Sequence, residues 1–178
     1  MFAEISKSVL TRGKFEMRKQ KGFSLIELLI VVAIILIIAA IAIPNLMRAR
    51  MAANESSAVG GVRTINTAEV GYNTLFPAIG FTSVLANLGG TGNPCTATST
   101  NSCLIDAVLS GGTKSGYTFT VAAGAGTGTP EPTYNANATP VTRNQTGVRD
   151  FCSFEDGVVR YSSPALAGAC AATTAPLQ

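Results

Sequence analysis

The strongest constraint on this sequence is an unbroken run of 16 apolar residues, Leu28–Ile43. Extended back to Phe23, the segment has 21 residues and is interrupted only by Ser24 and Glu27. An α-helix rises about 1.5 Å per residue, so this segment covers roughly 30 Å, the thickness of one bilayer core. We therefore expect residues 23–43 to cross a membrane as a helix.

The charged residues place the two flanks of this segment on opposite sides of that membrane. Residues 1–22 have six basic and two acidic side chains, a net charge of +4, whereas the rest of the chain has a net charge of −1. Basic residues that precede an apolar span stay in the cytoplasm. We therefore expect residues 1–22 in the cytoplasm and the chain after residue 43 to be exported. The exported part has no basic excess for binding nucleic acid.

The composition disfavours most enzymes. The chain contains no histidine, which excludes His-based triads, Cys–His dyads and imidazole metal sites. A membrane-tethered exported enzyme remains as a distant hypothesis. Its nucleophile needs a paired base, and the only lysine after residue 22 is Lys114. Lys114 precedes a Ser-Gly turn, where we expect it to be solvated, so we expect no enzyme and no cofactor.

The apolar segment has three interpretations. It is a signal peptide cleaved after Ala40-Ile41-Ala42, a plain membrane anchor, or part of a longer motif that includes the preceding junction. The third is favoured by residues 21–44, KGFSLIELLIVVAIILIIAAIAIP. This segment resembles the N-terminus of type IV pilins and of the related pseudopilins of type II secretion, and the resemblance is specific across residues 21–50.

The resemblance implies how the chain matures. A prepilin peptidase of the inner membrane would cut between Gly22 and Phe23 and methylate the new N-terminus at Phe23, so that residues 1–22 are a removed leader and the apolar helix is kept. A start at Met17 would leave the shorter leader MRKQKG, and the sequence does not distinguish it from a start at Met1.

Glu27 is an ionisable residue in an apolar span, where such residues are costly and usually functional. It lies four residues after Phe23, about one helical turn. In the resembling family, stacked subunits would let Glu27 meet the Phe23 amine of a neighbour, and a buried polar pair of this kind specifies register. The alternative is a carboxylate that reaches the cytoplasmic edge of the membrane.

The second half of the helix, residues 44–76, has a different pattern. Pro44 lacks a backbone donor, so we expect a kink there. Apolar residues then recur at helical spacing and predict a stripe that packs on a globular domain: Ala58, Val62, Ile65, Ala68, Tyr72 and Leu75. We expect the charged residues of this half to lie on its other faces, solvated or in inter-subunit pairs: Arg48, Arg50, Glu55, Arg63 and Glu69.

Residues 77–178 are predicted to form the exported head. Two short runs, 83–88 and 104–109, are helix-like, and Tyr117–Val121 alternates like a strand. We expect residues 124–140 to be a loop, with an edge strand at Tyr134. Val148–Phe154 and Val158–Ser162 are joined through Asp156-Gly157, a strong hairpin signal. The predicted fold is α+β, a long helix packed on an antiparallel sheet of three or four strands, which is the pilin fold in the resembling family.

The four cysteines lie in the exported part, where two disulfides are expected. Local pairing, Cys95–Cys103 and Cys152–Cys170, is preferred because each pair brackets a short loop. A zinc site would be the alternative, but no C-x-x-C spacing occurs. We expect no metal. The remaining candidate is a calcium site at the acidic residues Asp150, Glu155 and Asp156, although acids of a hairpin turn explain that cluster more simply.

The functional hypothesis is a structural subunit. Apolar helices leave lipid for a bundle of like helices with little net gain, so an assembly ATPase and platform outside this chain are implied. Head-to-tail contacts that do not close generate a fibre. The preferred interpretation is a homopolymeric type IV pilin, held in the inner membrane and then displayed as a surface filament for attachment, motility or DNA uptake. The alternative is a major pseudopilin.

Overall fold

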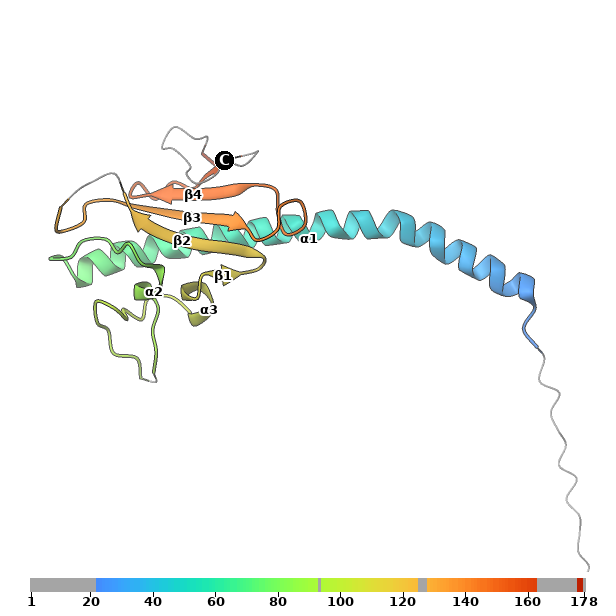
Figure 1. Ribbon diagram of the computed structural model, residues 1–178, viewed down its shortest axis with the longest axis horizontal. Helices are drawn as coiled ribbons and strands as arrows, with labels where there is room; N and C mark the ends of the chain where they lie inside the picture. The colour runs from blue at the N-terminus through green and yellow to red at the C-terminus, as the bar shows by residue number, and fades with distance from the viewer. Residues whose placement is uncertain (1–21, 93, 125–127, 163–175, 178) are drawn as a thin grey trace, which may run out of the picture. The chain divides into compact units, whose positions relative to one another are not determined.

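The computed structural model describes residues 22–92, 94–124, 128–162 and 176–177. The chain divides after Ile41 into two units, and helix α1 (Leu25–Leu75) belongs to both. The first unit is the apolar part of this helix. The second unit, which starts at Ala42, contains the rest of α1 and the head (Figure 1).

Helix α1 has no break at the residues that disfavour a helix. Pro44 lies inside it, and Gly60, Gly61 and Gly71 are all within its bounds. The kink expected at Pro44 concerns the angle between the two units and stays a prediction. The bending or fraying that glycines favour does not interrupt the helix, because its second half is held by packing on the head.

The head contains a five-stranded antiparallel sheet in the order β1-β2-β3-β4-β5. Figure 1 shows β2, β3 and β4 side by side along the second half of α1. Two short helices form at the helix-like runs of the sequence: α2 (Leu85–Leu88) lies within the first run, and α3 (Ala107–Ser110) extends one residue beyond the end of the second. The strands are β1 (Thr113–Lys114), β2 (Tyr117–Ala123), β3 (Tyr134–Pro140), β4 (Asp150–Phe154) and β5 (Arg160–Ser162). The α+β prediction is confirmed, with five strands where three or four were expected.

The expectation for residues 124–140 is wrong in one respect. Tyr134 begins β3, which is the central strand and not an edge strand. All seven residues of β3 pair with β2, and four of them also pair with β4. The Asn and Ala residues of this segment have weak intrinsic strand preference, so the local sequence indicated a loop, and the two neighbouring strands override it.

The core lies between the inner face of the sheet and the predicted stripe of α1. Five members of the stripe are buried, whereas Leu75, the last residue of the helix, is 51% exposed. Phe76, the next residue, packs against the core in its place, with its ring 5.0 Å from that of Tyr72. The stripe prediction is therefore wrong at Leu75, because the helix ends there and the chain turns.

The helix lies close to the sheet at Gly61. A Cβ atom added there would lie 2.6 Å from Cε1 of Phe119 in β2. Gly60, one residue earlier, has open space around it. Only the absence of a side chain at position 61 therefore allows the phenyl ring to pack against the helix backbone.

The hairpin of β4 and β5 forms where the Asp-Gly pair predicts it. Gly157 has a positive φ of 69° and occupies the turn. Asn66 of α1 holds this hairpin through its amide, which donates to Ser153 Oγ at 2.8 Å and to the carbonyl of Gly157 at 3.2 Å. The Tyr134 hydroxyl donates to Asn66 Oδ1 at 3.2 Å. One buried side chain thus joins the helix to two strands.

Candidate assembly surfaces

The predicted cleavage and methylation positions lie just before the start of α1. Gly22 and Phe23 precede the helix and are exposed, Phe23 to 75%. Ser24 is the residue before the helix, and its backbone N–H donates to Glu27 Oε2 at 3.3 Å. The carboxylate therefore caps the helix N-terminus as the fourth residue of an S-x-x-E capping box.

This cap is an additional role for Glu27, beyond the register role and the cytoplasmic-edge alternative expected from the sequence. The signal was present, because Ser24 and Glu27 have the spacing of a capping box. The roles of Glu27 and Pro44 in assembly remain predictions.

The first half of α1 offers a continuous apolar surface. Within the described residues, α1 is the one helix long and apolar enough to cross a membrane, and its 18-residue window of mean hydropathy 3.3 is 0% buried. Length and composition alone support this assignment. The described residues bury none of this window, and an apolar surface of this size is typical of a membrane or protein interface.

Glu55 anchors the head to the second half of α1. Its Oε1 accepts the backbone N–H groups of Val148 and Arg149, at 2.9 and 3.2 Å, and its Oε2 accepts Nε of Arg149 at 2.8 Å. Burial alone would raise the pKa of Glu55, but the hydrogen bonds from these donors outweigh it and lower that pKa. The carboxylate thus fixes the loop before β4 on the helix.

The prediction that the charged residues of α1 lie on its other faces is wrong for Glu55 and Glu69. They are 8% and 0% exposed and lie among the buried residues of the stripe. The signal was again present, because positions 55 and 69 continue the spacing of Ala58, Val62, Ile65 and Tyr72. The three arginines do lie on exposed positions: Arg48, Arg50 and Arg63.

The outer face of α1 contains threonines whose hydroxyls are already bonded. Thr64, Thr67 and Thr74 each donate to the carbonyl oxygen four residues earlier, at 3.0, 3.1 and 2.8 Å. Val70 and Leu75 lie exposed on the same half of the helix. This face therefore combines internally bonded hydroxyls with uncovered apolar side chains.

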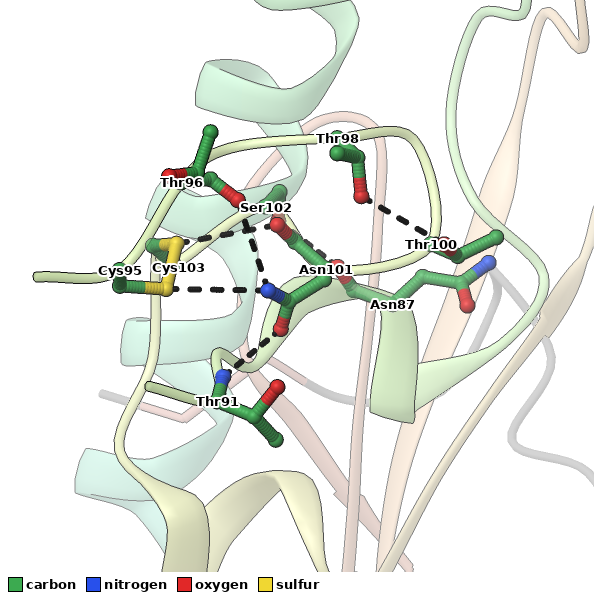
Figure 2. The surroundings of a disulfide bond; sticks show 9 residues. All are labelled: Asn87, Thr91, Cys95, Thr96, Thr98, Thr100, Asn101, Ser102 and Cys103. Carbon is green, nitrogen blue, oxygen red and sulfur yellow. Dashed lines mark hydrogen bonds between the residues drawn. A yellow bond between two sulfur atoms is a disulfide. The ribbon is translucent and has the colours of Figure 1, made fainter. Parts of the chain in front are cut away.

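The predicted disulfide between Cys95 and Cys103 is present, with a Cα–Cα distance of 6.2 Å. Figure 2 shows the surrounding loop, in which Asn101 is the central polar side chain. Its Oδ1 accepts Thr91 N at 2.9 Å, and its Nδ2 donates to Thr96 O at 3.5 Å. The hydroxyl of Ser102 donates to Asn87 O at 2.8 Å and joins the loop to α2. Disulfide and polar contacts together order this Thr-rich segment.

The second predicted disulfide includes a residue outside the described part of the chain. Cys152 lies in β4 and is buried, and Cys170 falls within residues 163–175, which the structure does not describe. The Cys152–Cys170 pairing therefore stays a prediction.

The three acidic residues considered for calcium do not converge. Asp150 begins β4 and is bound by Arg143 at 2.9 and 3.0 Å, whereas Glu155 and Asp156 follow the other end of that strand. Asp156 is bound by Arg160. No group of three metal-ligating side chains occurs among the described residues. The calcium hypothesis is wrong for this cluster, because two of its members are occupied by arginines.

Lys114, the base that a Ser–Lys enzyme would need, lies in β1. Its Nζ is 3.2 Å from Asp106 Oδ2. Asp106 also caps α3 by accepting the N–H groups of Val108 and Leu109. In the described part of the chain, Lys114 is thus engaged in an ion pair with the carboxylate that caps α3.

Comparison with known proteins concerns the N-terminal segment. The family model of the prokaryotic N-terminal methylation motif matches residues 17–43. The chain carries this motif. The methylation motif includes Gly22, Phe23 and Glu27, whereas the head lies beyond it.

Two curated relatives each match a part of the chain. The type IV wide pilus major component PilA4 of Thermus thermophilus is 65% identical over 40 residues, 22% of this chain and 30% of that protein. The type IV major pilin protein PilA of Myxococcus xanthus is 44% identical over 54 residues, 30% of this chain and 24% of that protein. Each match covers under a third of this chain and under a third of the relative's own length. No solved structure matches the chain.

Proposed function

We propose that this chain is a structural subunit of a type IV pilus. The observation that carries the proposal is the combination of the methylation motif with a long apolar helix segment of which the described residues bury nothing. Two relatives that match a part of this chain are named as a type IV pilus component and a type IV pilin. In this proposal the chain is not an enzyme, and its product is a homopolymer.

The chain matures in the inner membrane. A prepilin peptidase removes leader 1–22 on the cytoplasmic side by cutting between Gly22 and Phe23, and Phe23 is methylated. Residues 23–43 hold the subunit in the membrane as a single span. An assembly ATPase and its platform then move it into a filament on the cell surface, because transfer of the helix from lipid to a helix bundle gains little free energy by itself.

Glu27 sets the axial register of the filament. Its carboxylate meets the Phe23 amine of a neighbouring subunit, and Pro44 allows the helix to adjust near the end of the span. An isolated carboxylate in an apolar bundle is costly, so a subunit out of register leaves Glu27 without a cation and is disfavoured.

The proposal is tested on sheared cells by electron microscopy with an antibody against the head. We expect long surface fibres that contain this chain, and intact-mass analysis should show a methylated N-terminus at Phe23. Labelled fibres confined to the periplasm would favour the pseudopilin alternative. A chain that starts after Ala42, or one found only as monomers, would contradict the proposal.

The role of Glu27 is tested separately with Glu27→Gln. The amide oxygen can still accept the Ser24 N–H, so the helix cap is kept, whereas the charge that pairs with the amine is lost. We expect normal membrane insertion and strongly reduced incorporation into fibres. Glu155→Gln, the same change of charge at an exposed head residue, should assemble as wild type. Wild-type fibre yield for Glu27→Gln would refute the role of the charge.

A further inference from the structure

A cavity of about 370 Å³ lies between α1 and two loops of the head. This volume is within the range of small-ligand sites. The walls come from three segments, namely α1, the turn between β1 and β2, and the loop before β4: Met47, Arg50, Ser115, Gly116, Gln145 and Thr146. All of these segments belong to the unit that starts at Ala42.

The cavity walls are held in place by contacts with the helix. Ser115 and Gly116 have φ values of 50° and 73° and form a tight turn, and Ser115 Oγ is 3.0 Å from Oγ of Ser57 on α1. Asn54 of α1 donates to the carbonyl of Thr146 at 2.9 Å. Both loops that line the cavity are therefore fixed to the helix by hydrogen bonds.

Arg50 gives this cavity its charge. The four ion pairs of the described chain join other residues, and none includes Arg50. The remaining lining consists of hydroxyl, amide and apolar groups, with no acidic side chain. A guanidinium among neutral hydrogen-bonding groups is suited to an oxyanion, above all to phosphate.

The place of Arg50 along the helix indicates where that oxyanion comes from. Arg50 lies seven residues after Ile43, the last residue of the apolar run, which is about 10 Å of helix. The headgroup layer extends about 5–7 Å beyond each side of the hydrocarbon core, and a long arginine side chain reaches back toward it. Leu46 is exposed between the run and the cavity, and the cavity wall Met47 is exposed as well. An apolar surface therefore leads up to the guanidinium.

We propose that this cavity binds the phosphate-bearing headgroup of an anionic phospholipid while the subunit is held in the membrane. Arg50 binds the phosphate, the amide of Gln145 and the hydroxyl of Ser115 face the polar headgroup, and Met47 contacts the start of the acyl chains. The proposal rests on the membrane-anchored stage of the proposed function.

The test uses the mature chain, which starts at Phe23 and lacks the basic leader that would itself attract anionic lipid, reconstituted in phosphatidylcholine vesicles with a trace of spin-labelled phosphatidylglycerol or phosphatidylcholine. The motionally restricted fraction in electron paramagnetic resonance spectra gives the relative association of each lipid. We expect a several-fold preference for phosphatidylglycerol, which Arg50→Gln removes. Arg63→Gln is the matched control, because it removes the same charge about 20 Å farther along the helix. Equal association of both lipids with wild type, or a preference that survives Arg50→Gln, would overturn the proposal.

Two further comparisons separate a cavity from general attraction. Arg48 lies on the opposite side of the helix from Arg50, since two residues turn a helix by about 200°, and Arg48→Gln should keep most of the preference. Gln145→Glu places an anion in the cavity and should abolish the preference for phosphatidylglycerol. Asn73→Asp is its control, because it makes the same charge change about 35 Å from Arg50 along α1. The cavity assignment would be refuted if Arg48→Gln reduced the lipid preference as much as Arg50→Gln does, or if Gln145→Glu left that preference unchanged.

The source of the phosphate and the link to the proposed function are each tested directly. Inorganic phosphate at millimolar concentration should leave the lipid preference unchanged. If phosphate displaced the lipid, the cavity would be assigned to a soluble ligand and the proposal would be overturned.

Fibre formation is scored independently in cells. A wild-type chain that prefers phosphatidylglycerol but never forms fibres would refute the filament and support the lipid site. A chain that forms fibres without a lipid preference would support the filament and refute the lipid site.

Discussion

Glu69 lies on the inner face of α1 and is 0% exposed. Its Oε2 accepts the backbone N–H of Thr82 at 3.0 Å, but its Oε1 is buried and has no hydrogen-bond partner among the described residues. Burial raises the pKa of Glu69 from 4.5 to about 7, although the Thr82 hydrogen bond acts in the opposite direction. We predict that this residue makes the head less stable as the pH rises.

The sign and size of this effect follow from the shift. A carboxyl group whose pKa is higher in the folded state contributes stability that is complete below its unfolded pKa and is lost as the pH rises through its folded pKa. The shift from 4.5 to about 7 corresponds to about 3 kcal/mol. Most of this, roughly 2.5 kcal/mol, is lost between about pH 5 and pH 8. Glu69→Gln keeps an oxygen for Thr82 and cannot ionise, so it should remove this loss.

The measurement is urea unfolding of the full chain in detergent micelles, followed by tyrosine fluorescence at pH 5 and pH 8. Wild type should be more stable at pH 5, and Glu69→Gln should have nearly the same free energy of unfolding at both values. Glu155→Gln, at an exposed carboxylate, should keep the wild-type pH dependence. A wild type with equal stability at pH 5 and pH 8 would show that Glu69 is charged in the folded head and that the reasoning is wrong.

Three further changes test the packing of the head in the same unfolding assay. Gly61→Ala should lower the free energy of unfolding by about 1–3 kcal/mol, because the new methyl group overpacks against a β2 phenyl ring. Gly60→Ala should raise it by up to about 1 kcal/mol through helix propensity. Equal effects of the two changes would contradict the close approach at Gly61. Glu55→Ala should cost about 3 kcal/mol, because it leaves two backbone N–H groups and a guanidinium without their acceptor, and hydrogen exchange should show faster opening of the loop before β4. Replacing both Cys95 and Cys103 by Ser should cost roughly 2.5 kcal/mol, the loop-closure entropy of a short ring, and should expose this loop to proteases; unchanged proteolysis would show that the polar contacts suffice.

The features that the sequence predicted correctly are those determined by neighbouring residues. The apolar run lies within one continuous helix, and the periodic stripe defines the face of α1 that packs on the head. The Asp156-Gly157 pair predicts the hairpin because the turn requires a positive φ at Gly157. Cys95 and Cys103 are near in sequence, and a short loop brings them together.

The features that were missed depend on partners far away in the sequence. The central place of β3 is set by β2 and β4, which compensate for its weak strand preference. The burial of Glu55 depends on Arg149 and on a loop 93 and 94 residues later. The helical spacing does place Glu55 on the buried stripe, but no periodicity reveals the partner that would satisfy its charge there, so its charge assigned it to a solvated face.

The bonded threonines on the outer face of α1 change how readily that face loses water. A free hydroxyl that is covered by another molecule gives up its bonds to solvent and needs new ones. The hydroxyls of Thr64, Thr67 and Thr74 keep their bonds to the helix backbone whether or not the face is wet. A segment that hydropathy scales rate as polar can therefore be dehydrated at low cost, and a molecule that lies against it does not need to supply donors or acceptors in register.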